Sequence, residues 1–435
     1  MNNTPTSLYS DFLEKIIPEF NQYLDISKSK TLIFRGPKVL VTDSYFSISG
    51  ISYKKTPIIF DSYGDFIEVP SKWLIYLRTT RTSKGSVLQY ASAICSFWRH
   101  LQKVAHRDWQ KVDDTLLRDW RNRMTQGVDS INLEKRKRTI NNKLHVVIEF
   151  YKWAQEYGYV KNIIGITQPN HPPFPIRLVE VNYRNRIKKT SPLIYKTRKP
   201  PLLPIPTNEE IDSLYTHIAG STPAARRNVL LTKWALDSGM RESEILNRVI
   251  SDIPPLVKCQ ELIDSDRIYW LEIIGKGGKQ RIVPVTPEVL IETHRFITSS
   301  KHRLCPRDLM LKRRIRNTKE DKIFLSARTG EPLNRQSVSH IFSKTFLLVT
   351  GQSNRRKLHF HRLRARFASR LVQELAIQTM ESGRSIFELD EQKILLERAA
   401  DILGHQDTQS LKHYLNTFLD RNELAVSNAA RKSRR

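Results

Sequence analysis

The chain has 435 residues, of which 72 are Lys or Arg and 44 are Asp or Glu, and its net charge is +28. A chain of this length is expected to form two or three domains, and an excess of positive charge this large favours nucleic acid over an anionic membrane surface as its partner. No apolar run approaches the roughly 20 residues that span a bilayer, and no N-terminal stretch has the pattern of a signal peptide. Three scattered cysteines without CxxC spacing exclude a disulfide framework and a zinc site. We therefore expect a cytoplasmic, DNA-associated protein.

The first part of the chain changes character near residue 65. Residues 1–64 contain short apolar runs broken by Gly, Pro and Asp, which is typical of β structure or irregular packing, and we expect an N-terminal extension of unassigned function. Over residues 65–165, apolar side chains recur at spacings of three and four. This pattern predicts a small helical bundle, with helices over residues 87–101, 113–124 and 140–154.

A basic run, residues 135–138, lies at the expected start of the last of these helices. Cations at a helix N-terminus oppose the helix dipole, and a bound phosphate would compensate for that. A solvated helix face explains the run equally well when it is taken alone. The candidate DNA-binding residues are Arg136, Lys137, Arg138, Asn141 and Lys143.

Residues 166–205 are rich in proline and in basic side chains. A stretch of this composition between two patterned regions predicts an interdomain linker, and its charge suggests that it follows a DNA backbone.

Residues 206–435 are expected to form a second domain that is mainly α-helical with a small antiparallel β-sheet. Thr207 followed by Glu210 has the spacing of a capping box at a helix start. Two β-prone runs, residues 268–274 and 281–285, are joined by a glycine-rich turn and predict a hairpin. The remaining expected helices span residues 223–238, 286–298, 335–349, 361–374 and 389–402.

This second domain contains the residue types needed to cut a DNA backbone without a metal. Such chemistry needs guanidinium groups on the phosphate, a nucleophile and proton-transfer groups. Arg241 follows a glycine break, and His361 and Arg364 share a helix face at a spacing of three. His405 and Tyr414 are nine residues apart, which predicts a helix, a turn and a second helix. Each of these residues taken alone also fits an ordinary surface or core role.

Taken in order, the segments resemble the signature segments of the tyrosine recombinases, the family of phage integrases and Xer-type recombinases. The matching segments are Leu236–Glu244, Ile274–Val285, His361–Ala368, Leu403–His405 and Tyr414. The resemblance implies a helical, SAM-like core-binding domain and a tyrosine recombinase catalytic domain. It also implies a role for each candidate: Arg241 and Arg364 clamp the scissile phosphate, Lys276 (or nearby Lys279) protonates the leaving 5′ oxygen, His361 assists proton transfer, His405 binds the phosphate and Tyr414 attacks it.

The same resemblance implies partners and a cellular role. Four protomers act on two DNA duplexes through a 3′-phosphotyrosyl intermediate, with no metal, ATP or other cofactor, and accessory or directionality proteins can assist. The N-terminal extension and the high basicity favour the integrase of a mobile element. The sequence departs from the family at Ala365, where histidine is common, and in a long connection at residues 375–395. The alternatives are a type IB topoisomerase-like enzyme and a non-catalytic DNA-binding accessory or regulatory protein.

Overall fold

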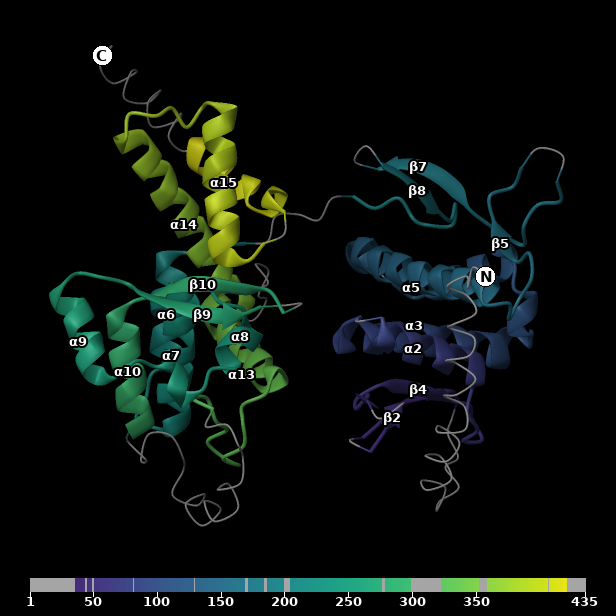
Figure 1. Cartoon of the computed structure of the whole chain (residues 1–435), viewed down its shortest axis with the longest axis horizontal. Coiled ribbons are helices and arrows are strands. Elements are labelled where there is room, and N and C mark those ends of the chain that lie inside the picture. The colour runs from purple at the N-terminus through teal and green to yellow at the C-terminus, as the bar shows by residue number, and fades with distance from the viewer. Residues whose placement is uncertain are drawn as a thin grey trace, which may run out of the picture. The chain divides into compact units, whose positions relative to one another are not determined.

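The computed structural model divides the chain into two compact units, residues 1–200 and residues 201–435 (Figure 1). It describes residues 36–43, 45–48, 51–80, 82–128, 130–168, 171–183, 186–198, 204–275, 278–298, 322–351, 358–405 and 407–420. Both units are mainly helical with small two-stranded sheets. None of the described helices is both long and apolar enough to cross a membrane.

In its described residues, the first unit combines small sheets with four α-helices. Strand β1 (Lys38–Val41) pairs antiparallel with β4 (Pro57–Phe60), and β2 (Ser47–Ile48) pairs with β3 (Ile51–Ser52). The helices are α2 (Glu68–Thr79), α3 (Lys84–His100), α4 (Asp114–Arg123) and α5 (Ser130–Glu156), with short helical turns η1 (Leu101–Ala105) and η2 (Trp109–Lys111). The three helices expected from the apolar spacing are confirmed as α3, α4 and α5; α2 is not among them.

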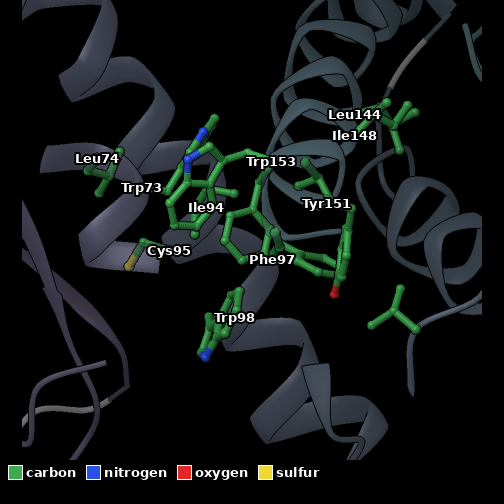
Figure 2. Close-up of a cluster of buried hydrophobic side chains, with 14 of the residues drawn as sticks. Trp73, Leu74, Ile94, Cys95, Phe97, Trp98, Leu144, Ile148, Tyr151 and Trp153 are labelled. Atoms are coloured by element: carbon green, nitrogen blue, oxygen red, sulfur yellow. The ribbon is translucent and has the colours of Figure 1, made fainter. Parts of the chain in front are cut away.

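An aromatic core holds these helices together. Figure 2 shows Phe97, Tyr151 and Trp153 gathered with aliphatic side chains. Phe97, Phe150 and Tyr151 are fully buried. Tyr151 meets both phenyl rings edge-on, at 6.3 and 5.2 Å between centroids, and each such pair adds about 0.5–1.5 kcal/mol beyond burial. Its hydroxyl donates to the Trp109 carbonyl at 2.7 Å, so burial leaves this polar group satisfied.

The described part of residues 1–64 shares this core. Ile58 and Ile59 on β4 are buried in the same cluster as the helical aromatics. The Ile59 backbone also bonds to the α2 region, since its N–H donates to Ser71 Oγ at 3.0 Å and its carbonyl accepts from Ile67 N–H at 2.9 Å. The β-prone texture of this stretch is present as β1 to β4, but the strands are part of the first unit's packing.

Much of the stretch expected to be a linker also packs into the first unit. Strands β5 (Ile164–Gly165) and β6 (Ile176–Arg177) pair in parallel, and β7 (Val179–Tyr183) and β8 (Arg186–Thr190) form a hairpin. Three apolar residues between the prolines are buried in the core: Ile176, Leu178 and Leu193. The division between the units falls at Pro200–Pro201, near the end of the stretch. Prolines and basic residues give this stretch the composition of a linker, although apolar residues between them anchor it to the core.

In the part of the second unit that the structure describes, one hairpin and a set of helices surround two apolar clusters of their own. Its elements are α6 (Asn208–Ile218), α7 (Pro223–Ser238), α8 (Glu242–Leu246), η3 (Ile250–Asp252), α9 (Leu256–Asp264), β9 (Tyr269–Ile274), β10 (Gln280–Val285), α10 (Pro287–Thr298), α13 (Arg335–Thr350), α14 (His361–Glu381), α15 (Leu389–Leu403) and η5 (Thr408–Ser410). The chain is helical again over residues 412–420. The expected hairpin and every expected helix are confirmed, including the Thr207–Glu210 capping box.

Two features of this unit position the candidate site. Helix α7 runs through the core, where Trp234 is fully buried and its ring N–H donates to Thr293 Oγ1 at 3.0 Å. Helix α14 packs on α7 and on α15.

The long connection at residues 375–395 is mostly helical, because α14 continues to Glu381 and α15 begins at Leu389. The extra residues therefore lengthen two packed helices.

Candidate active site

The candidate nucleophile, Tyr414, lies in the helical stretch after η5. Leu411 and Leu415 on either side are buried and anchor this stretch to the core of α14 and α15. The helix–turn–helix path predicted between His405 and Tyr414 is confirmed. Tyr414 itself is half-buried. Burial raises the pKa of its phenol, while the positive charges of Arg362 and Arg364 pull that pKa down. Tyr414 is therefore within the field of the guanidinium groups on α14.

Arg364 is buried on α14 and binds two backbone carbonyls from distant parts of the chain. Its guanidinium donates to the carbonyls of Gly239 and Leu403. Gly239 has a φ of 60°, and a Cβ there would lie 2.1 Å from the Phe367 ring, so only glycine fits this approach. Burial, followed by the charge of Arg241, lowers the pKa of Arg364 to about 9. The side chain is still cationic at neutral pH.

Arg241 immediately precedes α8 as its N-cap residue, and this helix start fixes its side chain. Its backbone N–H donates to Glu244 Oε2 and its Nη1 to Glu244 Oε1, both at 2.8 Å. Its Nη2 donates to the Gly404 carbonyl, also at 2.8 Å. Arg364 and Arg241 thus bind the consecutive carbonyls of residues 403 and 404, where α15 ends. The two candidate clamp residues, far apart in the sequence, meet at one helix terminus.

The two candidate histidines are close to these cations. His405 follows Gly404 directly, and its Nδ1 lies 2.9 Å from Ser410 Oγ. Burial, then the charges of Arg364, Arg241 and Arg281, lowers the pKa of His405 to about 4. Partial loss of solvent around its ring, then the neighbouring arginines, lowers the pKa of His361 to about 4, although the residue as a whole is exposed. Both imidazoles are therefore neutral near pH 7.

An open depression of about 1030 Å³ lies beside these residues. Its lining includes Arg241, Lys279, Arg281, His405 and Ser410, a cationic and hydrogen-bonding set that fits a phosphate diester. Lys276, the candidate acid, lies outside the described residues, whereas its alternative Lys279 lines the depression. Within the described ranges, no group of three or more His, Cys, Asp or Glu residues is arranged to hold a metal ion.

The candidate DNA-binding residues of the first unit are placed on α5, but in different roles. Arg136 is exposed, and Lys143 Nζ lies 3.3 Å from Ser96 Oγ. Lys137 pairs with Glu134 at 2.8 Å, and Arg138 donates to the Arg198 carbonyl at 2.8 Å.

The side chain of Asn141 forms a structural contact within the first unit. It is buried and bonds the Tyr195 backbone twice, accepting from its N–H at 2.9 Å and donating to its carbonyl at 2.8 Å. The basic run also lies more than one turn inside α5, which begins at Ser130. The helix dipole therefore does not call for a phosphate at this point, and the dipole argument is wrong.

Two arginines in the site are not identified by the sequence analysis. Arg362 on α14 is buried, its charge acts on Tyr414, and its Nε has no hydrogen-bond partner among the described residues. Arg281 on β10 is nearly buried and forms a two-pronged ion pair with Glu244. Strand alternation could have indicated Arg281, because it shares a face with the buried Val283 and Val285. A charged residue on the apolar face of a strand needs a partner.

The two domains match known sequence families. Residues 206–380 match the phage integrase family, and residues 71–158 match the N-terminal SAM-like domain of phage integrases. A tyrosine recombinase XerC of Oceanobacillus iheyensis is 24% identical over 287 residues, which cover 66% of this chain and 72% of the relative. A tyrosine recombinase XerC of Bacillus licheniformis is 26% identical over 342 residues, covering 78% of this chain and 88% of the relative.

A solved structure shares the fold. The XerH site-specific recombinase, in a post-cleavage complex with palindromic difH substrate, has a TM-score of 0.51 and 18% identity, covering 82% of this chain and 84% of that chain. The expected fold class is confirmed: a helical SAM-like domain and a recombinase catalytic domain. The chain belongs to the tyrosine recombinase family, which supports site-specific DNA recombination as its activity.

Proposed function

We propose that this chain cleaves and rejoins DNA through Tyr414. The phenolic oxygen attacks the scissile phosphorus, the bond from phosphorus to the 5′ oxygen breaks, and a 3′-phosphotyrosyl bond takes its place. The phenolic proton passes to a base, and the 5′ oxygen leaves with a proton from an acid. Attack by a 5′-hydroxyl group reverses these steps. Because one phosphodiester is exchanged for another, the cycle needs neither ATP nor a metal.

The proposed roles follow from charge and position. Arg241 and Arg364 neutralise the non-bridging phosphate oxygens as charge builds on them. His361, which is neutral near pH 7, assists the transfer of the tyrosine proton. His405 hydrogen-bonds the phosphate. The acid is Lys276, or Lys279 on the same hairpin turn.

One observation carries this proposal: residues from separate segments act on each other at one place. The charges of Arg362 and Arg364 act on the pKa of Tyr414. Those of Arg241 and Arg364 act on the pKa of His405, and both arginines bind the end of α15. A surface arginine or a core tyrosine in an ordinary role would not require such convergence.

The wider function is proposed from the family. We expect double-stranded DNA as the partner, with four copies acting on two paired sites and with accessory or directionality proteins as further partners. The added N-terminal strands and the net charge of +28 favour the integrase of a mobile element over a dimer-resolving role.

Adduct capture tests the nucleophile and selects the target sequence in the same experiment. The full chain is incubated with a random library of nicked duplexes, which trap a cleaved strand on the protein, and adducts that resist SDS are isolated and sequenced. The wild-type protein should enrich one sequence class. Tyr414→Phe should yield no adducts while it binds the enriched DNA within a few-fold of wild type.

A matched control is Tyr215→Phe. Tyr215 lies on α6 in the same unit, and burial raises its pKa to about 12, but it contacts a different part of the core. This variant should form adducts as the wild type does. Adducts that persist in Tyr414→Phe exclude Tyr414 as the nucleophile. Specific binding by wild-type protein without any adduct would favour the accessory-protein alternative, and relaxation of supercoiled DNA without strand exchange would favour the topoisomerase.

A further inference from the structure

Arg281 lies at the junction of three segments of the candidate site. It is on β10, at the end of the hairpin turn that begins with Gly275, and its side chain is 9% exposed. A Cβ on Gly275 would lie 2.8 Å from Arg281 Nη1, and a Cβ on Gly404 would lie 2.8 Å from both its Cδ and its Nη1. The arginine therefore occupies the space between the hairpin turn and the end of α15, and it fits only because both residues lack a side chain.

Glu244 links Arg281 to Arg241. Arg281 donates to the Glu244 carboxylate at 3.0 and 2.7 Å, and Arg241 donates to the same carboxylate at 2.8 Å. Burial alone would raise the pKa of Glu244, but hydrogen bonds from Arg281 and Arg241 outweigh it and lower the pKa to about 2. The carboxylate is therefore ionised across the working pH range and holds both guanidinium groups in fixed directions.

The same arginine also completes the cap of α15. The last carbonyls of a helix lack partners within the helix. Here the carbonyls of Ile402, Leu403 and Gly404 accept from Arg281 (Nε, 3.2 Å), Arg364 and Arg241 (2.8 Å), respectively. Three successive carbonyls thus fix three arginines side by side, and His405 follows immediately.

We propose that Arg281 is a positioning residue for DNA cleavage. Its guanidinium is already bonded to Glu244 and to the Ile402 carbonyl, so in the proposed site it supports the groups that hold the phosphate. It fixes the end of α15 against Glu244, so that Arg241, Arg364 and His405 keep the directions they need to hold a phosphate. This inference rests on the proposed function, and it predicts a defect in the rate of cleavage rather than in the affinity for DNA.

The test uses Arg281→Lys in the full chain, with a nicked duplex of the sequence enriched by adduct capture. Lysine keeps the charge but cannot bond Glu244 in two places and Ile402 at the same time. The single-turnover cleavage rate should fall about 100-fold, the size of effect seen when one preorganised donor of a catalytic site is lost. The dissociation constant for DNA should change less than threefold.

A sulfur substrate shows which part of the site Arg281 acts on. Replacing the bridging 5′ oxygen by sulfur gives a leaving group that needs no proton. Arg281→Lys should still cleave this substrate slowly, because Arg241 and Arg364 are no longer held in the directions needed to bind the phosphate. Lys276→Ala, which removes the proposed general acid, should regain a cleavage rate close to that of the wild type on this substrate.

Controls separate positioning from folding. Arg227→Lys alters another buried arginine of the same unit, which bonds the Leu325 carbonyl, and it should cleave within twofold of wild type. Gly275→Ala keeps Arg281 but places a methyl group against its guanidinium. The cleavage rate should fall about tenfold, less than in Arg281→Lys, because the arginine is displaced and not removed. The affinity for DNA should be retained.

The proposal is overturned by a normal rate in Arg281→Lys, by full recovery of that variant on the sulfur substrate, or by thermal stability and DNA affinity that fall in step with the rate. A wild-type protein that forms no adduct on any DNA overturns the proposed function instead.

Discussion

The two units of this recombinase use their positive charge differently. On α5 of the first unit, Arg136 is exposed and belongs to a basic run on the helix surface. In the second unit, Arg241 and Arg364 are partly or fully buried and bound to backbone carbonyls and to Glu244. An exposed cation adds salt-dependent affinity with little directional demand. A cation held in place by carbonyls costs no reorganisation during reaction, which is the requirement for stabilising a transition state.

The first prediction contrasts conservative substitutions in the two units. Arg364→Lys should reduce single-turnover cleavage at least about 100-fold, because an ammonium group cannot hold two carbonyls and a phosphate in one plane. Arg136→Lys should leave cleavage within twofold, because a point charge serves an exposed phosphate contact as well. Rates are measured on the nicked duplex at saturating protein. Similar rates for the two variants would erase the proposed difference between the units.

The contrast also shows which features the sequence can reveal. Helix α7 is predicted with its observed bounds, and α6 by its capping box, because apolar spacing and caps are local signals. The candidate catalytic residues are found by their order along the chain. Strand alternation indicates that Arg281 faces the core, but its role depends on Glu244 and Ile402, which are remote in the sequence.

The first unit gives two further examples. The sequence suggests a DNA contact at Asn141. In the structure its side-chain amide bonds the backbone of Tyr195, which is 54 residues away in the chain, and no sequence pattern predicts this contact. The prolines of residues 166–205 indicate a linker, yet Ile176 and Leu178 are buried between them. In both places a long-range contact gives a residue a structural role that its local sequence does not indicate.

The second prediction separates affinity from folding within α5. Arg136→Gln should flatten the salt dependence of DNA binding by roughly 0.9 in the slope of log affinity against log salt, the value for one lost phosphate contact, and should leave the melting temperature unchanged. Asn141→Ala should lower the melting temperature with little effect on that slope, because it leaves the Tyr195 backbone groups without a partner. Binding is measured by titration at several salt concentrations. An unchanged slope in Arg136→Gln would remove this residue from the DNA interface.

The third prediction concerns the protons of the second unit, and its expected effect is the smallest. The pKa of His405 is lowered to about 4 in the folded protein, against an ordinary value of 6.5. Between pH 4 and pH 6.5 the imidazole is therefore protonated in the unfolded chain but neutral in the folded chain. The contribution of this difference to the free energy of unfolding is fully retained above pH 6.5 and is lost as the pH falls toward 4. After allowance for solvent screening at this half-buried site, the loss at pH 5 is about 1 kcal/mol, or roughly 2–4 °C in melting temperature.

His405→Gln should remove that part of the acid sensitivity. The fall in melting temperature between pH 7 and pH 5 should be smaller in the variant than in wild type, whereas Arg136→Gln in the first unit should show the wild-type fall. Differential scanning calorimetry of the DNA-free protein measures both. Equal falls in His405→Gln and wild type would mean that the arginines around α15 do not suppress the charge on this imidazole. The cationic field that is proposed to bind the phosphate would then be weaker than the structure indicates.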